Sequence, residues 1–262
     1  MKKGYAQVNG LKMYYEIHGE GMPLVLLHGG GSTITTTFGN VLQAFAANRQ
    51  VIAVELQAHG HTADIDRPLT FEQDADDVAS LLKQLSIPKS DIFGFSNGGS
   101  SAMQVAIRHP EAVRKLVVAS SFFKRDGVYP QLWTFMEQAS LENMPQQLKD
   151  TYLSINPDHK GLSAMHDKDK QRMLDFKDWP EDALKSIQSP TLLIIGDKDV
   201  VKPEHAVEMY RLIPQAQLTI LPAGHGDYIG EITSIKKNDK LPLLVVAMIE
   251  KFLDDNTSEN KK

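Results

Sequence analysis

The chain has 262 residues, a formal net charge of −5 at pH 7 and a sequence pI near 6.0. This charge balance excludes the strong positive field that attracts nucleic acid, and no apolar run approaches the roughly 20 residues of a membrane span, so we expect a small-molecule partner and a cytoplasmic location. The absence of cysteine excludes disulfides, thiolate metal sites and a cysteine nucleophile, while the oligomeric state is left open.

The first half of the chain alternates strand and helix signals. An Asn9-Gly10 dipeptide marks a tight hairpin, because both residues tolerate a positive φ. Thr70 and Gln73 form a capping signature ahead of a helix with apolar residues at helical spacing. The expected elements are strands at 5–8, 12–17, 23–27 and 50–55 and helices at 37–47 and 74–85.

A serine stands where a predicted strand, residues 91–95, turns sharply into a predicted helix, residues 97–107. Gly94 and Gly98 flank Ser96 in the pattern Gly-x-Ser-x-Gly. Such a tight turn holds strained backbone angles and leaves no room for side chains two residues away. The helix start also points unpaired N–H groups at the serine, where they can stabilise a developing negative charge. The pattern predicts a nucleophile, and an ordinary glycine-containing turn is the alternative.

The second half resumes this alternation after a long helical interruption. A strand is expected at 115–119, and residues 122–188 then contain only short amphipathic helical pieces. The later elements are strands at 191–195 and 216–221 and helices at 203–213 and 241–253. The sequence therefore predicts an α/β fold with its core at 1–121 and 189–255, a helical cap inserted at 122–188 and a disordered tail at 256–262.

Three loops that follow predicted strands carry residues of chemical interest, namely Ser96, the Gly-Asp-Lys-Asp stretch at 196–199 and a Gly-His-Gly turn at His225. In a parallel sheet these strand ends share one edge, which is where ligands bind. Together with the glycine loop at 28–32, this ordered set resembles the α/β-hydrolase superfamily over nearly the whole chain. The resemblance implies a mostly parallel, eight-stranded sheet with helices on both faces.

The resemblance also implies a Ser-His-Asp triad. Ser96 matches the family's nucleophile elbow and His225 its histidine loop, so His225 is the expected general base. The acid loop offers two aspartates, and its Gly-x-x-Asp register with a downstream proline favours Asp199 over Asp197. Some relatives carry the acid after the preceding strand, but here that position falls at Ser120-Ser121, which cannot serve.

Backbone N–H groups complete the expected site. One oxyanion donor is expected from Asn97 at the helix start and the other from Gly30, with Gly31 as the alternative. His28 is expected to tie down the glycine loop. The two histidines at 59–61 are expected to be structural, with a substrate contact as the alternative.

Apolar residues of the expected cap are candidates to line a substrate pocket, although amphipathic helices bury such residues for packing as well. These candidates are Trp133, Phe135, Met136, Tyr152 and Met165, and Gly31 of the glycine loop is a further candidate for substrate binding. Neither metal-ligand spacing nor a phosphate or dinucleotide glycine pattern occurs, so no metal and no cofactor are expected.

The sequence therefore predicts a cofactor-free serine hydrolase that cleaves a small carboxylic ester or lactone through an acyl-enzyme. A serine in place of a carboxylate or thiolate argues against the chemistry of haloalkane dehalogenases, epoxide hydrolases and dienelactone hydrolases, which are similar proteins. Three alternatives stay open: carbon–carbon bond hydrolysis of ring-fission diketones, perhydrolysis, and a ligand-binding receptor built on the same fold.

Overall fold

The structure is a computed structural model that describes residues 1–236 and 239–255, so the tail predicted at 256–262 lies outside the described residues. One eight-stranded sheet has the strand order β1-β2-β4-β3-β5-β6-β7-β8. Its strands are β1 (Lys2–Val8), β2 (Leu11–His18), β3 (Met22–Leu27), β4 (Arg49–Glu55), β5 (Ser90–Phe95), β6 (Val113–Ala119), β7 (Thr191–Lys198) and β8 (Ala216–Gly224).

Only the first two strands depart from parallel pairing. β1 and β2 form the antiparallel hairpin, and Asn9 and Gly10 at its turn have φ of 48° and 86°. β2 pairs antiparallel with β4, whereas the strands from β4 across to β8 are all mutually parallel. The carboxyl ends of β3, β5, β6, β7 and β8 therefore meet at one edge of the sheet.

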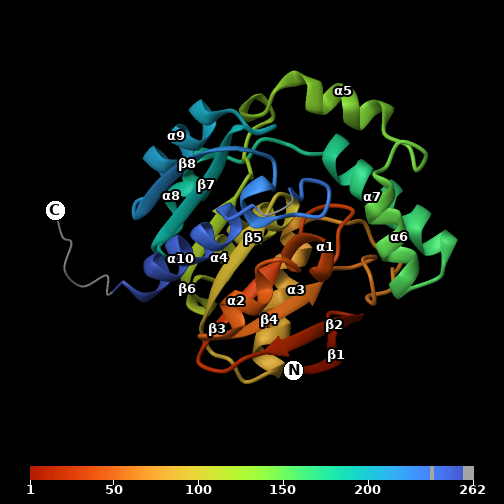
Figure 1. The fold of residues 1–262 in the computed structure, drawn as a ribbon, viewed down its shortest axis with the longest axis horizontal. Coiled ribbons are helices and arrows are strands. Elements are labelled where there is room, and N and C mark those ends of the chain that lie inside the picture. The colour runs from red at the N-terminus through yellow and green to blue at the C-terminus, as the bar shows by residue number, and fades with distance from the viewer. Residues whose placement is uncertain (237–238, 256–262) are drawn as a thin grey trace.

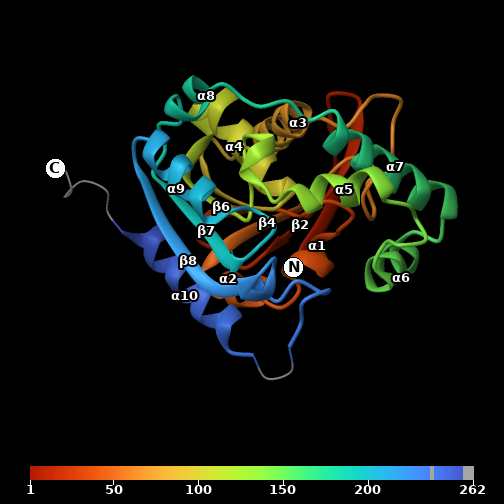
Figure 2. The ribbon, with the colours of Figure 1, turned by 90° about the horizontal axis from the view of Figure 1, so that it is seen from above.

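Helices cover both faces of this sheet (Figures 1 and 2). Those on the first face are α3 (Phe71–Gln84), α4 (Asn97–Arg108), α8 (Glu181–Lys185) and α9 (Pro203–Leu212). Those on the second face are α1 (Ile34–Phe38), α2 (Leu42–Ala46) and α10 (Leu241–Asp254). Three 3-10 turns, η1 (Pro110–Ala112), η2 (Arg125–Gly127) and η3 (Asp227–Ile229), complete the connections.

The central strands are buried on both faces, as their continuous apolar sequences predict. All six residues of β5 are buried, with Ile92 packed into the cluster beneath α3 and α4 and Phe93 into the cluster beneath α1, α2 and α10. Phe93 makes edge-to-face contacts with Phe38 and Phe45, at ring-centroid distances of 5.3 and 6.0 Å. This packing holds β5, which precedes Ser96, in the middle of the fold.

One predicted helix, residues 37–47, is instead two short helices separated by Gly39, Asn40 and Val41. The Gly39 amide donates to Thr35 O at 3.0 Å and ends α1, while Asn40 Nδ2 donates to Gly230 O at 2.6 Å. This tertiary contact breaks a segment whose periodicity alone predicts one helix. The Thr70 cap is present, since its hydroxyl accepts from the Gln73 amide at 3.0 Å, and α3 begins at Phe71.

The segment between β6 and β7 contributes helices and no sheet strand, apart from one isolated β-bridge between Val128 and Val201. Its other helices are α5 (Pro130–Gln138), α6 (Gln146–Ile155) and α7 (His159–Leu174). In Figure 1 these three green helices lie together beyond the sheet, away from α10. We call residues 122–188 the inserted segment. Across residues 1–236 and 239–255, no helix is both long and apolar enough to cross a membrane.

Candidate active site

Ser96 occupies the turn between β5 and α4 in a strained conformation, with φ of 55° and ψ of −123°. Positive φ is costly for a residue with a side chain, so the surrounding packing must enforce it. A Cβ on Gly94 would lie 2.0 Å from Gly98 O, and a Cβ on Gly98 would lie 2.1 Å from Leu27 O. Both flanking glycines are therefore required by direct backbone contact, as the sequence pattern predicts.

The structure brings the three predicted side chains together at the carboxyl edge of the sheet. Asp199 directly follows β7 and His225 directly follows β8. His225 lies 2.7 Å from Asp199 through Nδ1 and Oδ1, and 3.2 Å from Ser96 through Nε2 and Oγ. Asp197 does not take part in these contacts, because its Oδ1 accepts from the Ala223 amide at 3.0 Å.

The surroundings of Asp199 favour its ionised form. Burial opposes ionisation, but the His225 charge and the hydrogen bonds from His225 and Ser120 lower the pKa of Asp199. Burial likewise opposes a charge on His225, yet the Asp199 carboxylate raises the pKa of that imidazole above its ordinary value. In neutral His225 the proton therefore sits on Nδ1, facing Asp199, and Nε2 is left to accept the Ser96 proton.

Two further hydroxyl groups stand behind Asp199, and the sequence analysis did not assign them a role in the site. Ser120 follows β6 with φ of 51°, and its hydroxyl donates to Asp199 Oδ2. The Tyr228 hydroxyl lies 2.5 Å from Ser120 Oγ, and Tyr228 is fully buried. Burial and the Asp199 charge raise the pKa of Tyr228, which keeps its proton. The sequence signal was the position of Ser120 after β6, where relatives can carry an acid.

The Gly30 and Gly31 amides of the glycine loop differ in their hydrogen bonding. The Gly31 N–H donates to Asp169 Oδ2 at 2.5 Å, so it is already engaged. Within residues 1–236 and 239–255, the Gly30 N–H has no hydrogen-bond partner. Asn97 is the first residue of α4, where an amide has no helical acceptor. A Cβ on Gly30 would lie 2.4 Å from Asn97 Nδ2, which explains the glycine there.

His28 is neutral and structural, as expected for the residue that ties down the glycine loop. Its Nδ1 lies 2.8 Å from Gly29 O, to which it donates, and its Nε2 accepts from the Leu56 amide at 3.1 Å. Burial, reinforced by the nearby charge of His59, lowers the pKa of His28 to about 3.

His59 is charged although it is fully buried. Its Nδ1 lies 2.8 Å from Gln57 O and its Nε2 lies 2.8 Å from Asp169 Oδ2. Because both oxygens can only accept, both ring nitrogens must carry protons. Burial acts to lower the pKa of His59, but the charge and hydrogen bond of Asp169 raise it above the ordinary value. His59 does not line the cavity described below, and both of its ring nitrogens contact other residues of the chain.

Asp169 belongs to a buried polar cluster that the sequence analysis missed. Arg172 donates to Asp169 Oδ1 and, at 2.9 Å, to Asp74 Oδ2, which also accepts from Ser101 Oγ at 2.7 Å. Two cations and two carboxylates thus face one another among helices α3 and α7 and the loop after β4. Burial opposes ionisation, but Arg172 and His59 lower the pKa of Asp169 below its usual range. No sequence signal links His59 to a residue 110 positions later.

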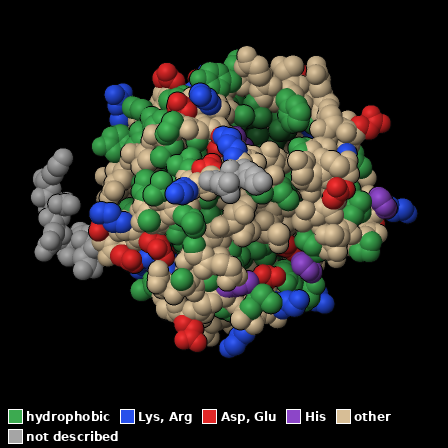
Figure 3. All heavy atoms as spheres, viewed as in Figure 1, with side chains coloured by type: hydrophobic (Ala, Val, Ile, Leu, Met, Phe, Trp, Pro, Cys, Tyr) green, Lys and Arg blue, Asp and Glu red, His purple; other side chains and the backbone are tan. Residues whose placement is uncertain are grey.

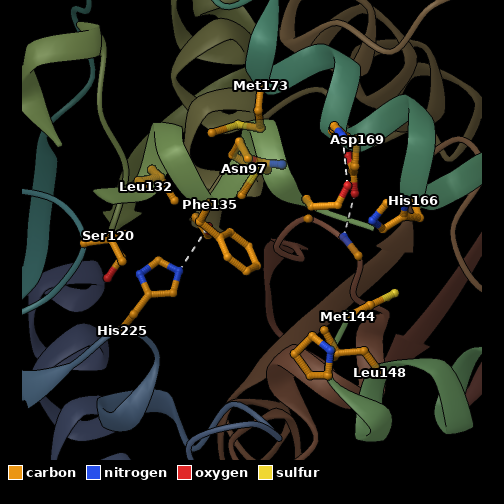
Figure 4. Close-up of a pocket in the computed structure, with 18 of the residues that line it drawn as sticks. Asn97, Ser120, Leu132, Phe135, Met144, Leu148, His166, Asp169, Met173 and His225 are labelled. Carbon is orange, nitrogen blue, oxygen red and sulfur yellow. Dashed lines mark hydrogen bonds between the residues drawn. The ribbon is translucent and has the colours of Figure 1, made fainter. Parts of the chain in front are cut away.

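A cavity of about 290 Å³ opens onto Ser96 and His225, and its lining is predominantly apolar. Phe135, Met136 and Gly31, three of the predicted pocket residues, line it, and Figure 3 shows hydrophobic side chains around a recess below α5. Further apolar residues of the lining are Phe122, Leu132, Met144, Leu148, Met173, Val200 and Val201. The inserted segment supplies most of these side chains, and Figure 4 shows Leu132, Met144 and Met173 on different sides of the space.

Trp133 is not part of this lining, contrary to the sequence prediction. Its Nε1 donates to Arg125 O at 2.9 Å, and the Arg125 guanidinium lies 3.8 Å from the ring centroid. The ring also packs edge-on against Phe122. Tyr152 and Met165 do not line the cavity either, because they are buried in an apolar cluster that includes the lining residues Met144 and Leu148. Helical periodicity identifies the apolar face of α5, but it cannot tell whether a residue on that face meets core side chains or lines a cavity.

Comparison with known proteins identifies the family to which the chain belongs. The model of the alpha/beta hydrolase family matches residues 24–231. The chain is 28% identical over 242 residues to a 2-hydroxymuconate semialdehyde hydrolase from a Pseudomonas species, covering 82% of this chain and 84% of that protein. It is 26% identical over 238 residues to a pimeloyl-[acyl-carrier protein] methyl ester esterase from Nitrosospira multiformis, covering 81% and 90%.

Among solved structures, the enol-lactonase from Burkholderia xenovorans matches with a TM-score of 0.73 at 22% identity, over 96% of this chain and 100% of that one. This likeness shows a shared fold. The family model spans most of the chain, from within β3 through β8, and includes Ser96, Asp199 and His225. The chain therefore belongs to the alpha/beta hydrolase family.

Proposed function

We propose that this protein is a serine hydrolase that cleaves a small, largely apolar carboxylic ester or lactone through an acyl-enzyme. The observation that carries the proposal is the hydrogen-bonded line from Ser96 through His225 to buried Asp199, opening onto an apolar cavity of about 290 Å³. That volume lies at the low end for ligand pockets, which favours a small substrate.

In the proposed acylation, the His225 Nε2 removes the Ser96 proton while Oγ attacks the substrate carbonyl carbon. The carbonyl oxygen becomes an oxyanion that accepts hydrogen bonds from the Asn97 and Gly30 N–H groups. The tetrahedral intermediate then collapses, and the imidazolium returns its proton to the leaving alkoxide. Asp199 holds the Nδ1 proton and stabilises the transient imidazolium throughout.

Deacylation repeats these roles with water as the nucleophile. The His225 Nε2 removes a proton from water, which attacks the acyl carbon, and the collapse returns a proton to Ser96 Oγ. The products are the carboxylic acid and regenerated serine. The inserted segment acts as a cap in this proposal, because its helices α5, α6 and α7 supply the apolar wall around the acyl group.

Carbon–carbon bond hydrolysis is the second candidate, because one relative is a 2-hydroxymuconate semialdehyde hydrolase. A muconate-type substrate carries a carboxylate, which needs a cationic partner in an apolar pocket. Of the described residues that line the cavity, only Lys170 has a fixed positive charge, and its ammonium donates to Glu137 O and Ala139 O at 3.2 and 2.8 Å. This engagement favours uncharged esters and lactones.

The test combines covalent labelling with turnover. A fluorophosphonate probe is expected to label Ser96, as located by peptide mass spectrometry, and the protein is expected to hydrolyse p-nitrophenyl butyrate. Ser96→Ala is expected to abolish labelling and lower kcat by at least about 10⁴-fold. Ser100→Ala is the matched control, since Ser100 Oγ pairs with Ser121 Oγ at 2.8 Å and does not line the cavity.

Three outcomes would overturn the ester proposal. Turnover that persists in Ser96→Ala would show that Ser96 is not the nucleophile. Faster cleavage of vinylogous diketones than of any ester or lactone in a panel favours the carbon–carbon reaction. Tight binding of esters without product release by mass spectrometry points instead to a receptor.

A further inference from the structure

One helix of the inserted segment reaches the glycine loop directly. Asp169, on α7, accepts the Gly31 N–H through Oδ2 at 2.5 Å, and Figure 4 shows this carboxylate on the opposite side of the pocket from His225. The same oxygen would lie 3.3 Å from a Cβ on Gly30. The amide next to the proposed oxyanion donor is therefore held by a residue 138 positions later in the chain.

The Asp169 carboxylate cannot turn freely, because cations hold both of its oxygens. The His59 imidazolium donates to Oδ2 at 2.8 Å, and Arg172 donates to Oδ1. Arg172 is in turn held by Asp74 on α3 at 2.9 Å. The side chains of His59, Arg172 and Asp74 are at most 4% exposed, so this arrangement is fixed by the domain core.

The loop itself needs such support. Residues 29–31 are three consecutive glycines, and Gly31 has φ of 64°, so the backbone has little intrinsic preference for one conformation. Oxyanion donors are effective only when they are held in place before charge develops. An anionic acceptor on the Gly31 amide fixes the peptide that follows the Gly30 N–H.

We propose that Asp169 is a positioning residue that holds the Gly30 N–H in place for the oxyanion, an inference that rests on the proposed function. Since Asp169 belongs to the inserted segment, this half of the oxyanion site is complete only when α7 is docked on the glycine loop. The helices that surround the substrate thereby also contribute to the reaction at its carbonyl group.

The test compares Asp169→Asn with Asp175→Asn, which changes the exposed C-cap carboxylate of the same helix. The asparagine retains the size of the side chain, but its neutral amide cannot serve Gly31, His59 and Arg172 together. Asp169→Asn is expected to lower kcat for p-nitrophenyl butyrate by about 10- to 100-fold, less than the roughly 10²–10³-fold cost of deleting an oxyanion donor. KM is expected to change by no more than about twofold, because the donor acts mainly on the transition state.

A trifluoromethyl ketone separates positioning from a purely structural role. It forms a hemiketal with a charged oxygen in the oxyanion site, so its Ki is expected to rise by the same factor as kcat falls. Arg172→Lys retains the positive charge but holds the Asp169 carboxylate less firmly. Its kcat and its Ki for the ketone are expected to lie between those of the wild type and those of Asp169→Asn. This second variant keeps the test informative should Asp169→Asn fold poorly.

Backbone amide exchange supplies an independent readout. Faster exchange in residues 29–32 of Asp169→Asn, with the sheet unchanged, is expected. Unchanged kcat and Ki in a folded Asp169→Asn, or losses that follow only the unfolded fraction, would overturn the inference. The proposed function fails separately, because it requires labelling and turnover by the wild-type protein.

Discussion

The Ser120 hydroxyl offers a quantitative test of how Asp199 is held. Ser120 Oγ donates to Asp199 Oδ2 and lies 2.5 Å from the Tyr228 hydroxyl. A carboxylate can only accept, so the protons run from Tyr228 to Ser120 and from Ser120 to Asp199. All three residues are at most 5% exposed, so no bulk water replaces a lost partner.

Ser120→Ala removes one hydrogen bond to a charged acceptor, worth about 1.5–3 kcal/mol, and leaves the buried Tyr228 hydroxyl without its acceptor, which costs about 1–3 kcal/mol. Partial relaxation makes the sum an upper bound, so we expect the free energy of unfolding to fall by about 2–4 kcal/mol. Tyr228→Phe removes only the neutral bond, worth about 1 kcal/mol. The double variant should lose about 1–2 kcal/mol less than the sum of the single changes, because no orphaned hydroxyl remains.

Urea unfolding of the wild type, the two single variants and the double variant measures the coupling between Ser120 and Tyr228. The pH dependence of kcat/KM for p-nitrophenyl butyrate measures the effect of these changes on the active site. We expect Ser120→Ala to lower kcat/KM by about 10-fold, equivalent to about 1.4 kcal/mol. Ser121→Ala is the control, because Ser121 pairs with Ser100 rather than with Asp199. Strict additivity in the double variant, or an equal loss of kcat/KM in Ser121→Ala, would refute the proton order described above.

Three further predictions concern the acid, the buried histidine and the pocket. Asp199→Asn is expected to lower kcat by about 10⁴-fold, whereas Asp197→Asn should lower it by less than about 10-fold, and equal losses in steady-state assays would contradict the assignment of the acid. Because folding raises the pKa of His59 above 6.5, its contribution to the free energy of unfolding is complete below about pH 6.5 and is lost as the pH rises through the folded-state value. His59→Gln should therefore flatten the decline in stability seen by urea titration from about pH 6 to about pH 9, and an unchanged slope would show that His59 is neutral. Phe135 lines the cavity yet is 46% exposed, so Phe135→Ala should shift the preferred p-nitrophenyl ester toward longer acyl chains, as a chain-length series would show.

Features that depend on one short segment are predictable from the sequence. The turn at Ser96 is defined by glycines two residues away, and the structure shows the backbone contacts that require them. The strand ends at Asp199 and His225 follow from the alternation of apolar strands with helices. The family resemblance adds the role of each strand end, namely that the nucleophile, the acid and the base follow one another along the chain.

Features that depend on which side chains meet across the fold were not predictable. The contact of His59 with Asp169 joins a core loop to the inserted segment, and neither residue has a local pattern that distinguishes it from an ordinary surface residue. Trp133 shows the opposite case, because its place on the apolar face of an amphipathic helix predicts that it packs inward, but not against which neighbours, and the structure shows it partly buried against Phe122. The division of the helix predicted at 37–47 likewise depends on Asn40 meeting Gly230.

The order of strands in the sheet has a consequence for biosynthesis. β5, which precedes Ser96, is complete once residue 95 has been made. The strands that precede Asp199 and His225 are β7 and β8, and they are made only after an insertion of some 70 residues. β7 joins the sheet by pairing with β6, and β8 joins it by pairing with β7. On the proposed function, the growing chain carries its nucleophile long before it has a base. The serine therefore remains chemically inert on the ribosome until β7 and β8 emerge and dock, and the last quarter of the chain determines when activity begins.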